Sequence, residues 1–150
     1  VDKSAREAVK WLRVAAEQGY PKAQGLLGLA LITTEEVRDV AEGLRWVRKA
    51  AAEGDPTGQS LLGELLVFGK AGVEKNEAEG ATWYRKAAEQ GQPNAQYTLA
   101  RLFAQGIGVK KNAVQSNFWL GLAAAQGHPD ARKVVEQMKK QPGKSPDVSK

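Results

Sequence analysis

One short motif occurs four times in the chain at a nearly constant interval. Each copy has a tryptophan, an alanine pair four residues later, then a glycine and a proline. The tryptophans are Trp11, Trp46, Trp83 and Trp119, which are 35, 37 and 36 residues apart. Self-similarity at such a period is typical of a solenoid, in which each unit packs only on its neighbours. The sequence therefore predicts about four repeats of roughly 36 residues.

A single unit indicates two helices joined by a turn. In the unit that begins at Ala95, apolar side chains recur at helical spacing as far as Phe103. Gly106 and Gly108 then supply the backbone freedom that a turn needs. The segment 112–126 has a second apolar stripe at the spacing of a helix. We therefore expect an all-α fold in which each repeat is a helix–turn–helix pair.

Small residues recur at one aligned position in each helix of the pair. In the first helix they are Gly28, Gly63 and Ala100, and in the second helix they are Ala8, Gly43, Gly80 and Ser116. Small side chains let two helices approach closely, and an indole ring fills the gap beside them. We therefore expect every tryptophan to be structural and largely buried between helices.

The pattern also predicts how the chain is organised. Because the unit at 22–55 lacks glycines between its helices, its junction is expected to differ in shape. The chain opens with Val1 and with an unpaired half-unit, so a first helix is expected before it, or a neighbouring chain over it. The expected parts are a half-unit at 4–20, units at 22–55, 57–92 and 94–128, a terminal helix at 130–140 and a disordered basic tail at 141–150.

The charge distribution argues against a nucleic-acid partner. The net charge is +5, but residues 131–150 carry six basic and two acidic side chains, which leaves 16 basic and 15 acidic side chains in the repeats. A phosphate-binding protein is expected to have a continuous basic stripe, which these repeats lack. No apolar run is long enough to span a membrane. The absence of cysteine excludes disulfides and zinc–sulfur sites.

The residues give little support to enzymatic chemistry. His128 is the only histidine, and it occupies a variable turn position with no partner that would orient a general base. The glycines at 69, 72, 106 and 108 join helix to helix and lack the sequence of a phosphate-binding loop. The acidic pair Glu35 and Glu36 has no companions at metal-ligand spacing. We therefore expect no catalytic residue, no metal and no cofactor.

Positions at which the repeats disagree indicate a binding surface instead. They follow one another at intervals of four along the first helix of each unit and form one stripe. First helices usually line the concave side of such a solenoid. The alternatives are that Phe68 closes the core between units, and that Tyr97 and Arg101 lie on an ordinary exposed face. The expected partner-binding residues are Leu29, Ser60, Glu64, Phe68, Tyr97, Arg101 and Gln105.

The residues 59–91 carry a pattern that resembles the Sel1-like repeat family, a relative of the tetratricopeptide repeat. The pattern includes Leu62-Gly63 and the run from Trp83 to Gly91, which reads WYRKAAEQG. The similarity extends over residues 4–138, although the unit at 22–55 lacks the family's turn glycines. The resemblance implies a right-handed superhelix without enzymatic activity that acts as an adaptor or inhibitor in bacterial envelopes, secretion or signalling.

These expectations lead to one class of function with two possible roles. The chain is expected to be a non-catalytic bacterial scaffold that binds another protein along its inner face. One role is an immunity-type inhibitor that neutralises a secreted antibacterial effector or toxin in the periplasm or cell envelope. The other is an assembly or signalling adaptor for an envelope, polysaccharide or motility system. A cytoplasmic location and any oligomeric state stay open.

Overall fold

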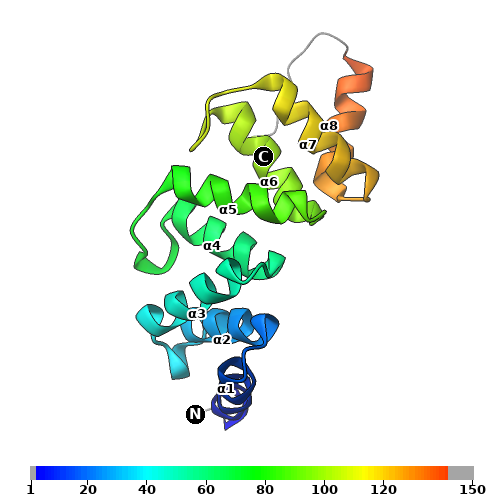
Figure 1. Cartoon of the computed structure of the whole chain (residues 1–150). Coiled ribbons are helices and arrows are strands. Elements are labelled where there is room, and N and C mark those ends of the chain that lie inside the picture. Colours follow the sequence, from blue (N-terminus) through cyan, green and yellow to red (C-terminus); the bar gives the residue numbers. More distant parts are fainter. Residues whose placement is uncertain (1–2, 142–150) are drawn as a thin grey trace.

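The structure is a computed structural model that describes residues 3–141, and in this range it contains helices and no strand (Figure 1). The expected all-α solenoid is confirmed. The tail expected at 141–150 falls outside the described residues from 142 onward. The helices are α1 (Lys3–Glu17), α2 (Pro21–Thr33), α3 (Val40–Ala52), α4 (Pro56–Phe68), α5 (Glu77–Glu89), α6 (Pro93–Gln105), α7 (Ala113–Ala125) and α8 (Pro129–Lys140), with 3-10 turns η1 (Glu35–Val37) and η2 (Lys70–Gly72).

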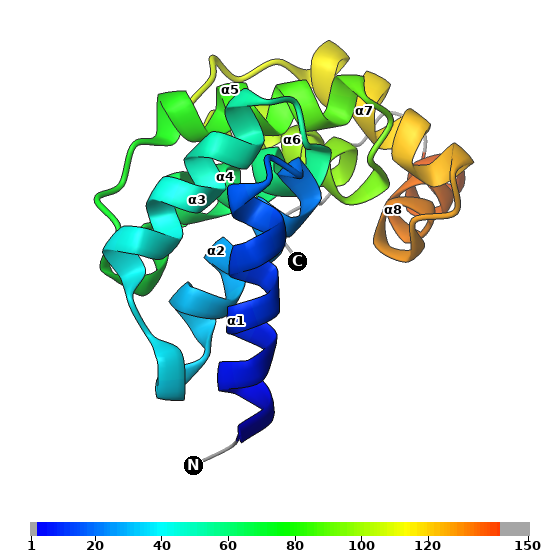
Figure 2. The ribbon, with the colours of Figure 1, turned by 60° about the horizontal axis from the view of Figure 1, so that its bottom comes forward.

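The helices stack as consecutive pairs along the chain. The most extensive contacts join α2 with α3, α4 with α5, and α6 with α7, and each second helix also contacts the first helix that follows it. The stack curves, with α2, α4 and α6 on its inner side and α3, α5 and α7 on its outer side (Figure 2). The solvent-exposed faces of α2, α4 and α6 therefore form the inner surface of the solenoid.

The turns between helices follow from local chemistry. Helices α4 and α6 end at Gly69 and Gly106, whose φ angles of 63° and 69° lie in the left-handed region that glycine tolerates best. Helix α2 ends instead at Thr34, which is extended with a φ of −94°. The different shape expected for the junction between α2 and α3 is therefore confirmed. Helix α3, which follows this junction, still begins at a side-chain cap, because the Asp39 carboxylate accepts a hydrogen bond from the amide of Glu42 at 3.0 Å.

The two helices of a pair touch through their small residues. A Cβ added to Gly28 would lie 2.5 Å from Val47 Cγ2 and 2.7 Å from the carbonyl oxygen of Gly43, so no larger residue fits. In the last full unit Ala100 and Ser116 take these places, and the Ser116 hydroxyl donates to the Ala100 carbonyl at 2.8 Å. The close approach expected from the sequence is therefore confirmed.

The expectation that every tryptophan is buried is only partly right. Trp119 is 7% exposed, Trp46 and Trp83 are half-buried, and Trp11 is 62% exposed. The Trp46 indole packs against a cluster that combines Ala16 of the preceding second helix with Leu27 of its own unit, so it needs an earlier helix to complete that core. Within residues 3–141 nothing precedes α1, so the Trp11 ring has no core to cover. The expectation was wrong for Trp11.

Candidate protein-interaction surface

The inner surface contains part of the stripe expected from the sequence. Leu29 on α2 is 37% exposed and Phe68 on α4 is 45% exposed. Glu64 and Arg101 are half-buried, and Gln105 is exposed at the end of α6. The surface therefore changes along the array, from apolar on α2 to polar and charged on α6.

Two residues of the expected stripe make contacts across the boundary between units, and of these Ser60 is half-buried and Tyr97 is buried. The Ser60 hydroxyl donates to the side-chain carbonyl of Gln92, the residue just before α6. Tyr97 is 6% exposed, and its ring stacks on His128, just before α8, with 4.5 Å between the centroids. This line of positions points at the start of the next first helix, because adjacent units are rotated relative to one another. Its residues join the units together.

Other residues of the inner surface were missed by the sequence analysis. Leu26 is 41% exposed, and its aligned counterparts Leu61 and Thr98 are half-buried. Tyr20, which precedes α2, is 61% exposed. The available signal was that Leu26 and Leu61 share one aligned position, one residue after the stripe position that proved to be structural.

The middle of the inner surface carries a local charge pair. Lys70 forms an ion pair with Glu64 and also lies 5.9 Å from the centroid of the Phe68 ring. Both partners of the pair are partly solvated, with side-chain exposures of 55% and 40%. Such pairs stabilise a fold weakly, about 0–1 kcal/mol. Lys70 and Glu64 can therefore separate and pair with charged groups on a partner protein.

Buried glutamines form a second set of contacts between units, which the sequence analysis missed. Gln24, Gln59 and Gln96 occupy one aligned position, and each donates to a backbone carbonyl of the preceding second helix at 3.1–3.3 Å. The side-chain oxygen of Gln59 then accepts from Gln90 at 2.8 Å, and that of Gln96 accepts from Gln126 at 2.7 Å. These bonds fix each unit against the next. The signal was one glutamine at the same place in all three units.

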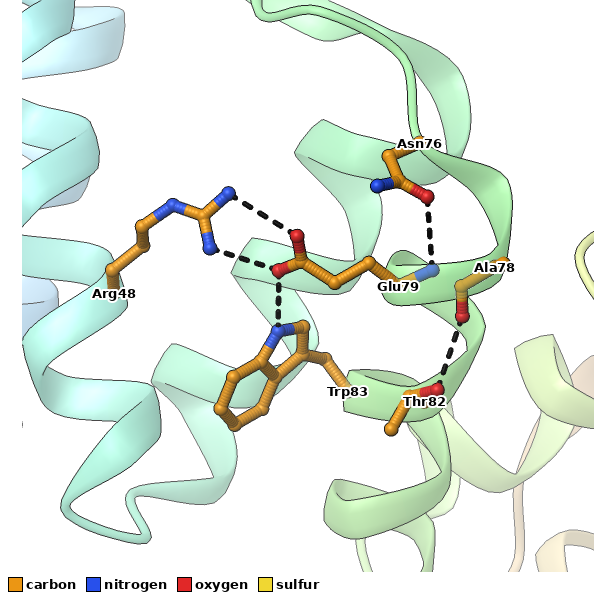
Figure 3. Close-up of polar contacts among 6 residues, drawn as sticks. All are labelled: Arg48, Asn76, Ala78, Glu79, Thr82 and Trp83. Atoms are coloured by element: carbon orange, nitrogen blue, oxygen red, sulfur yellow. Dashed lines mark hydrogen bonds and ion pairs between the residues drawn. The ribbon is translucent and has the colours of Figure 1, made fainter.

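An arginine, a glutamate and a tryptophan connect adjacent units on the outer side. The Glu79 carboxylate accepts from Arg48 of the preceding unit at 2.8 and 3.4 Å, and from the Trp83 indole at 2.9 Å (Figure 3). Glu42 accepts from Arg13 and Trp46 in the same way. The hydrogen bond from Arg48 is the main cause of a lowered pKa of Glu79, with Trp83 contributing.

The described part of the chain shows how its few reactive groups are used. His128 Nδ1 accepts from the amide of Ala131 at 3.3 Å, so the imidazole caps α8. Burial raises the pKa of the Tyr84 hydroxyl. Among residues 3–141 no three acidic or histidine side chains gather as metal ligands do. None of the helices in this range combines the length and apolar character that crossing a bilayer requires.

The repeat pattern matches a known family model over most of the chain. The Sel1 repeat model matches residues 1–20, 21–55, 56–92 and 93–128. The chain belongs to the Sel1 repeat family. Sel1 repeats typically form scaffolds for protein–protein interaction, so the family agrees with an arrangement that offers surfaces for binding. None of the curated proteins matches the chain.

Solved Sel1 structures share the fold. The Sel1 repeat protein from Oxalobacter formigenes is 37% identical with a TM-score of 0.77, and the alignment covers 84% of this chain and 95% of that protein. The protective antigen c5321 of uropathogenic Escherichia coli is 34% identical with a TM-score of 0.78, over 85% of this chain and 27% of that protein. The Helicobacter pylori cysteine rich protein B is 26% identical with a TM-score of 0.68, over 84% and 96%.

Proposed function

We propose that this Sel1 repeat protein is a non-catalytic bacterial scaffold that binds one protein partner along its inner surface. The observation that carries the proposal is the composition of that surface. Leu26, Leu29 and Phe68 are large apolar side chains that stay exposed on the first helices. Exposed apolar side chains beside charged ones are typical of interface centres. Arg101 and Glu64 then provide the charged contacts that set the orientation of the partner.

Within this class we favour an immunity-type inhibitor that neutralises a secreted effector in the periplasm or cell envelope. An inhibitor of this kind needs a rigid surface, because a preorganised surface loses less entropy on binding. The glutamine bonds and the arginine–glutamate pairs between units supply such rigidity. The second candidate is an assembly or signalling adaptor. Partner purification from the native host with mass spectrometry separates the two, since an effector enzyme supports the first and a structural complex the second.

Substitution of the inner surface tests the location of the site. Leu29→Asp and Arg101→Ala are expected to weaken binding of the purified partner by about 1–3 kcal/mol each. The first places a charge in an apolar contact, and the second removes a charged side chain from the interface. Lys49→Asp on the outer side of α3 is the control and is expected to leave the affinity unchanged. Equal effects at all three positions, or an effect of Lys49→Asp alone, would place the site elsewhere.

A further inference from the structure

The outer side of α7 has an apolar face that the other outer helices lack. Val114, Phe118 and Leu122 follow one another at intervals of four and are 78%, 55% and 38% exposed. The aligned residues are Ala41, Arg45 and Lys49 on α3, and Ala78, Thr82 and Lys86 on α5. Helix α7 also contains no charged residue between Ala113 and Ala125. An exposed apolar patch of this kind marks an interaction site in a folded protein.

A groove lies directly beside this face. It has a volume of about 320 Å³ and runs between α7 and α8, with Gly121, Ala124 and Ala125 on one side. The other side is formed by Arg132, Val135, Glu136 and Lys139 of α8. A Cβ on Gly121 would meet nothing within 4 Å, so the α7 side of the groove is open.

The position of the groove in the repeat explains its shape. Ala51 and Leu62 belong to the cluster on which the Trp83 ring of the next second helix packs. Their aligned counterparts here are Ala124 and Val135. The groove is thus built like the place that receives a helix with an aromatic residue inside the array.

The groove is nevertheless not suited to a further Sel1 unit or to a second copy of this chain. Glu136 stands where Gly28 and Gly63 allow two helices to touch, and Lys139 stands where earlier units have a buried leucine. These side chains prevent the close approach of a repeat pair. Helix α1 is basic overall, with four basic and two acidic residues, so it would be repelled by Arg132 and Lys139.

We propose that the α7 face and the adjoining groove bind an acidic amphipathic helix of a second protein. The apolar side of that helix packs on Val114, Phe118 and Leu122, and its aromatic residue enters the groove against Ala124. Its acidic residues meet Arg132 and Lys139, which outnumber Glu136, the one carboxylate that lines the groove. The pair of Lys139 and Glu136 is solvated and loose, at 3.8 Å, so it leaves Lys139 accessible. Because this surface lies on the outer side and the proposed partner surface on the inner side, the scaffold would hold two proteins at once.

A pair of designed peptides of about 18 residues, or five helical turns, tests the proposal. Both have one leucine-rich face with a single tryptophan, and their polar face is glutamate in one and lysine in the other. Binding is followed by calorimetry, and the contact residues by amide chemical shifts. The acidic peptide is expected to bind with a Kd below about 1 mM and at least about 10-fold more tightly than the basic one, with shifts confined to α7 and α8.

The matched variant is Phe118→Arg with Leu122→Lys, which introduces the residues that α3 carries at these positions and so leaves the fold intact. It adds positive charge, so purely electrostatic binding would become stronger, whereas docking on the apolar face weakens by at least about 10-fold. Arg45→Ala with Lys49→Ala on α3 is the control and changes nothing.

Four outcomes would overturn the proposal. They are no binding of the acidic peptide at about 1 mM, unchanged binding to the Phe118→Arg, Leu122→Lys variant, concentration-dependent dimers that this variant abolishes, and binding of the wild type to vesicles of anionic lipid but not to the peptide. The third outcome would assign the face to a second copy, and the fourth to a membrane surface.

Discussion

Tyr97 stacks on His128 with 4.5 Å between the ring centroids and 29° between the planes. The aligned pair in the preceding unit is Ser60 and Gln92, which are hydrogen-bonded to each other. In the unit before that, a Cβ on Gly25 would lie 3.4 Å from the Asp55 carboxylate. One structural position thus holds three different pairs, each matched in size across the boundary between units.

The matching predicts energetic coupling between Tyr97 and His128. Tyr97→Ser alone should cost about 2–4 kcal/mol, because it leaves a cavity under the His128 ring. Adding His128→Gln recreates the serine–glutamine pair of the preceding unit, so the double variant should be more stable than additivity predicts by about 0.5–2 kcal/mol. Urea unfolding of the four proteins measures this coupling. Strict additivity would show that Tyr97 and His128 contribute to stability independently of each other.

A glutamate that replaces a glutamine leaves one buried oxygen without a donor. The side-chain oxygen of Gln24 is buried, and no donor among the described residues reaches it. The equivalent oxygens of Gln59 and Gln96 accept from Gln90 and Gln126. In the first full unit the residue aligned with these two donors is Glu53, which has no side-chain N–H to donate. Glu53→Gln supplies a donor and should stabilise the fold by about 1 kcal/mol, as measured by urea unfolding. Glu89→Gln removes the same charge at an exposed site and should have no such effect.

The sequence predicted the fold because residues with the same packing role recur at the same positions in successive units. Glycine at 28 and 63, leucine at 27 and 62 and the proline that begins each first helix all recur, so the packing of one unit predicts that of the others. The sequence predicted less well which side chains of the first helices are exposed. A helix period gives the faces of one helix, but not which face the next unit covers. That depends on the rotation between units, which decides that Tyr97 is buried while Leu26, outside the expected stripe, is exposed.

The tryptophans should differ in their contribution to stability, although they are equivalent in sequence. Trp119→Ala opens a cavity in a well-packed core and should cost about 3–5 kcal/mol. Trp11→Ala should cost less than about 0.5 kcal/mol, because the ring is 62% exposed. Trp83→Ala should lie between these values, since its ring is half-buried. Chemical unfolding followed by helical circular dichroism gives the order. Equal costs would mean that α1 is covered in solution.

The bond between Glu79 and Arg48 should make stability depend on pH. The pKa of Glu79 is lower in the folded state, so its contribution is present above the unfolded value of about 4.3 and is lost as the pH falls through the folded value. Both side chains are partly solvated, so Glu79→Gln should cost only about 0.2–1 kcal/mol at neutral pH. The difference from the wild type should disappear in acid. A difference that persists at low pH would assign the loss to packing.

The last full unit lacks the glutamate, and restoring it should stabilise the protein. Gln115 stands at the position of Glu42 and Glu79, and the buried indole nitrogen of Trp119 has no acceptor among the described residues. Gln115→Glu offers a carboxylate to this indole, and it also places a negative charge in the first turn of α7, where the helix dipole favours it.

The expected gain from Gln115→Glu is about 1 kcal/mol at neutral pH, and protonation of the new carboxylate should remove it in acid. Asn117→Asp is the charge-matched control, because Asn117 is exposed two residues further along the same helix. Thermal unfolding at neutral and acidic pH compares the two variants. If both stabilise equally, the effect is electrostatics at the helix end. If only Gln115→Glu does, the indole has gained the acceptor that Glu79 provides for Trp83.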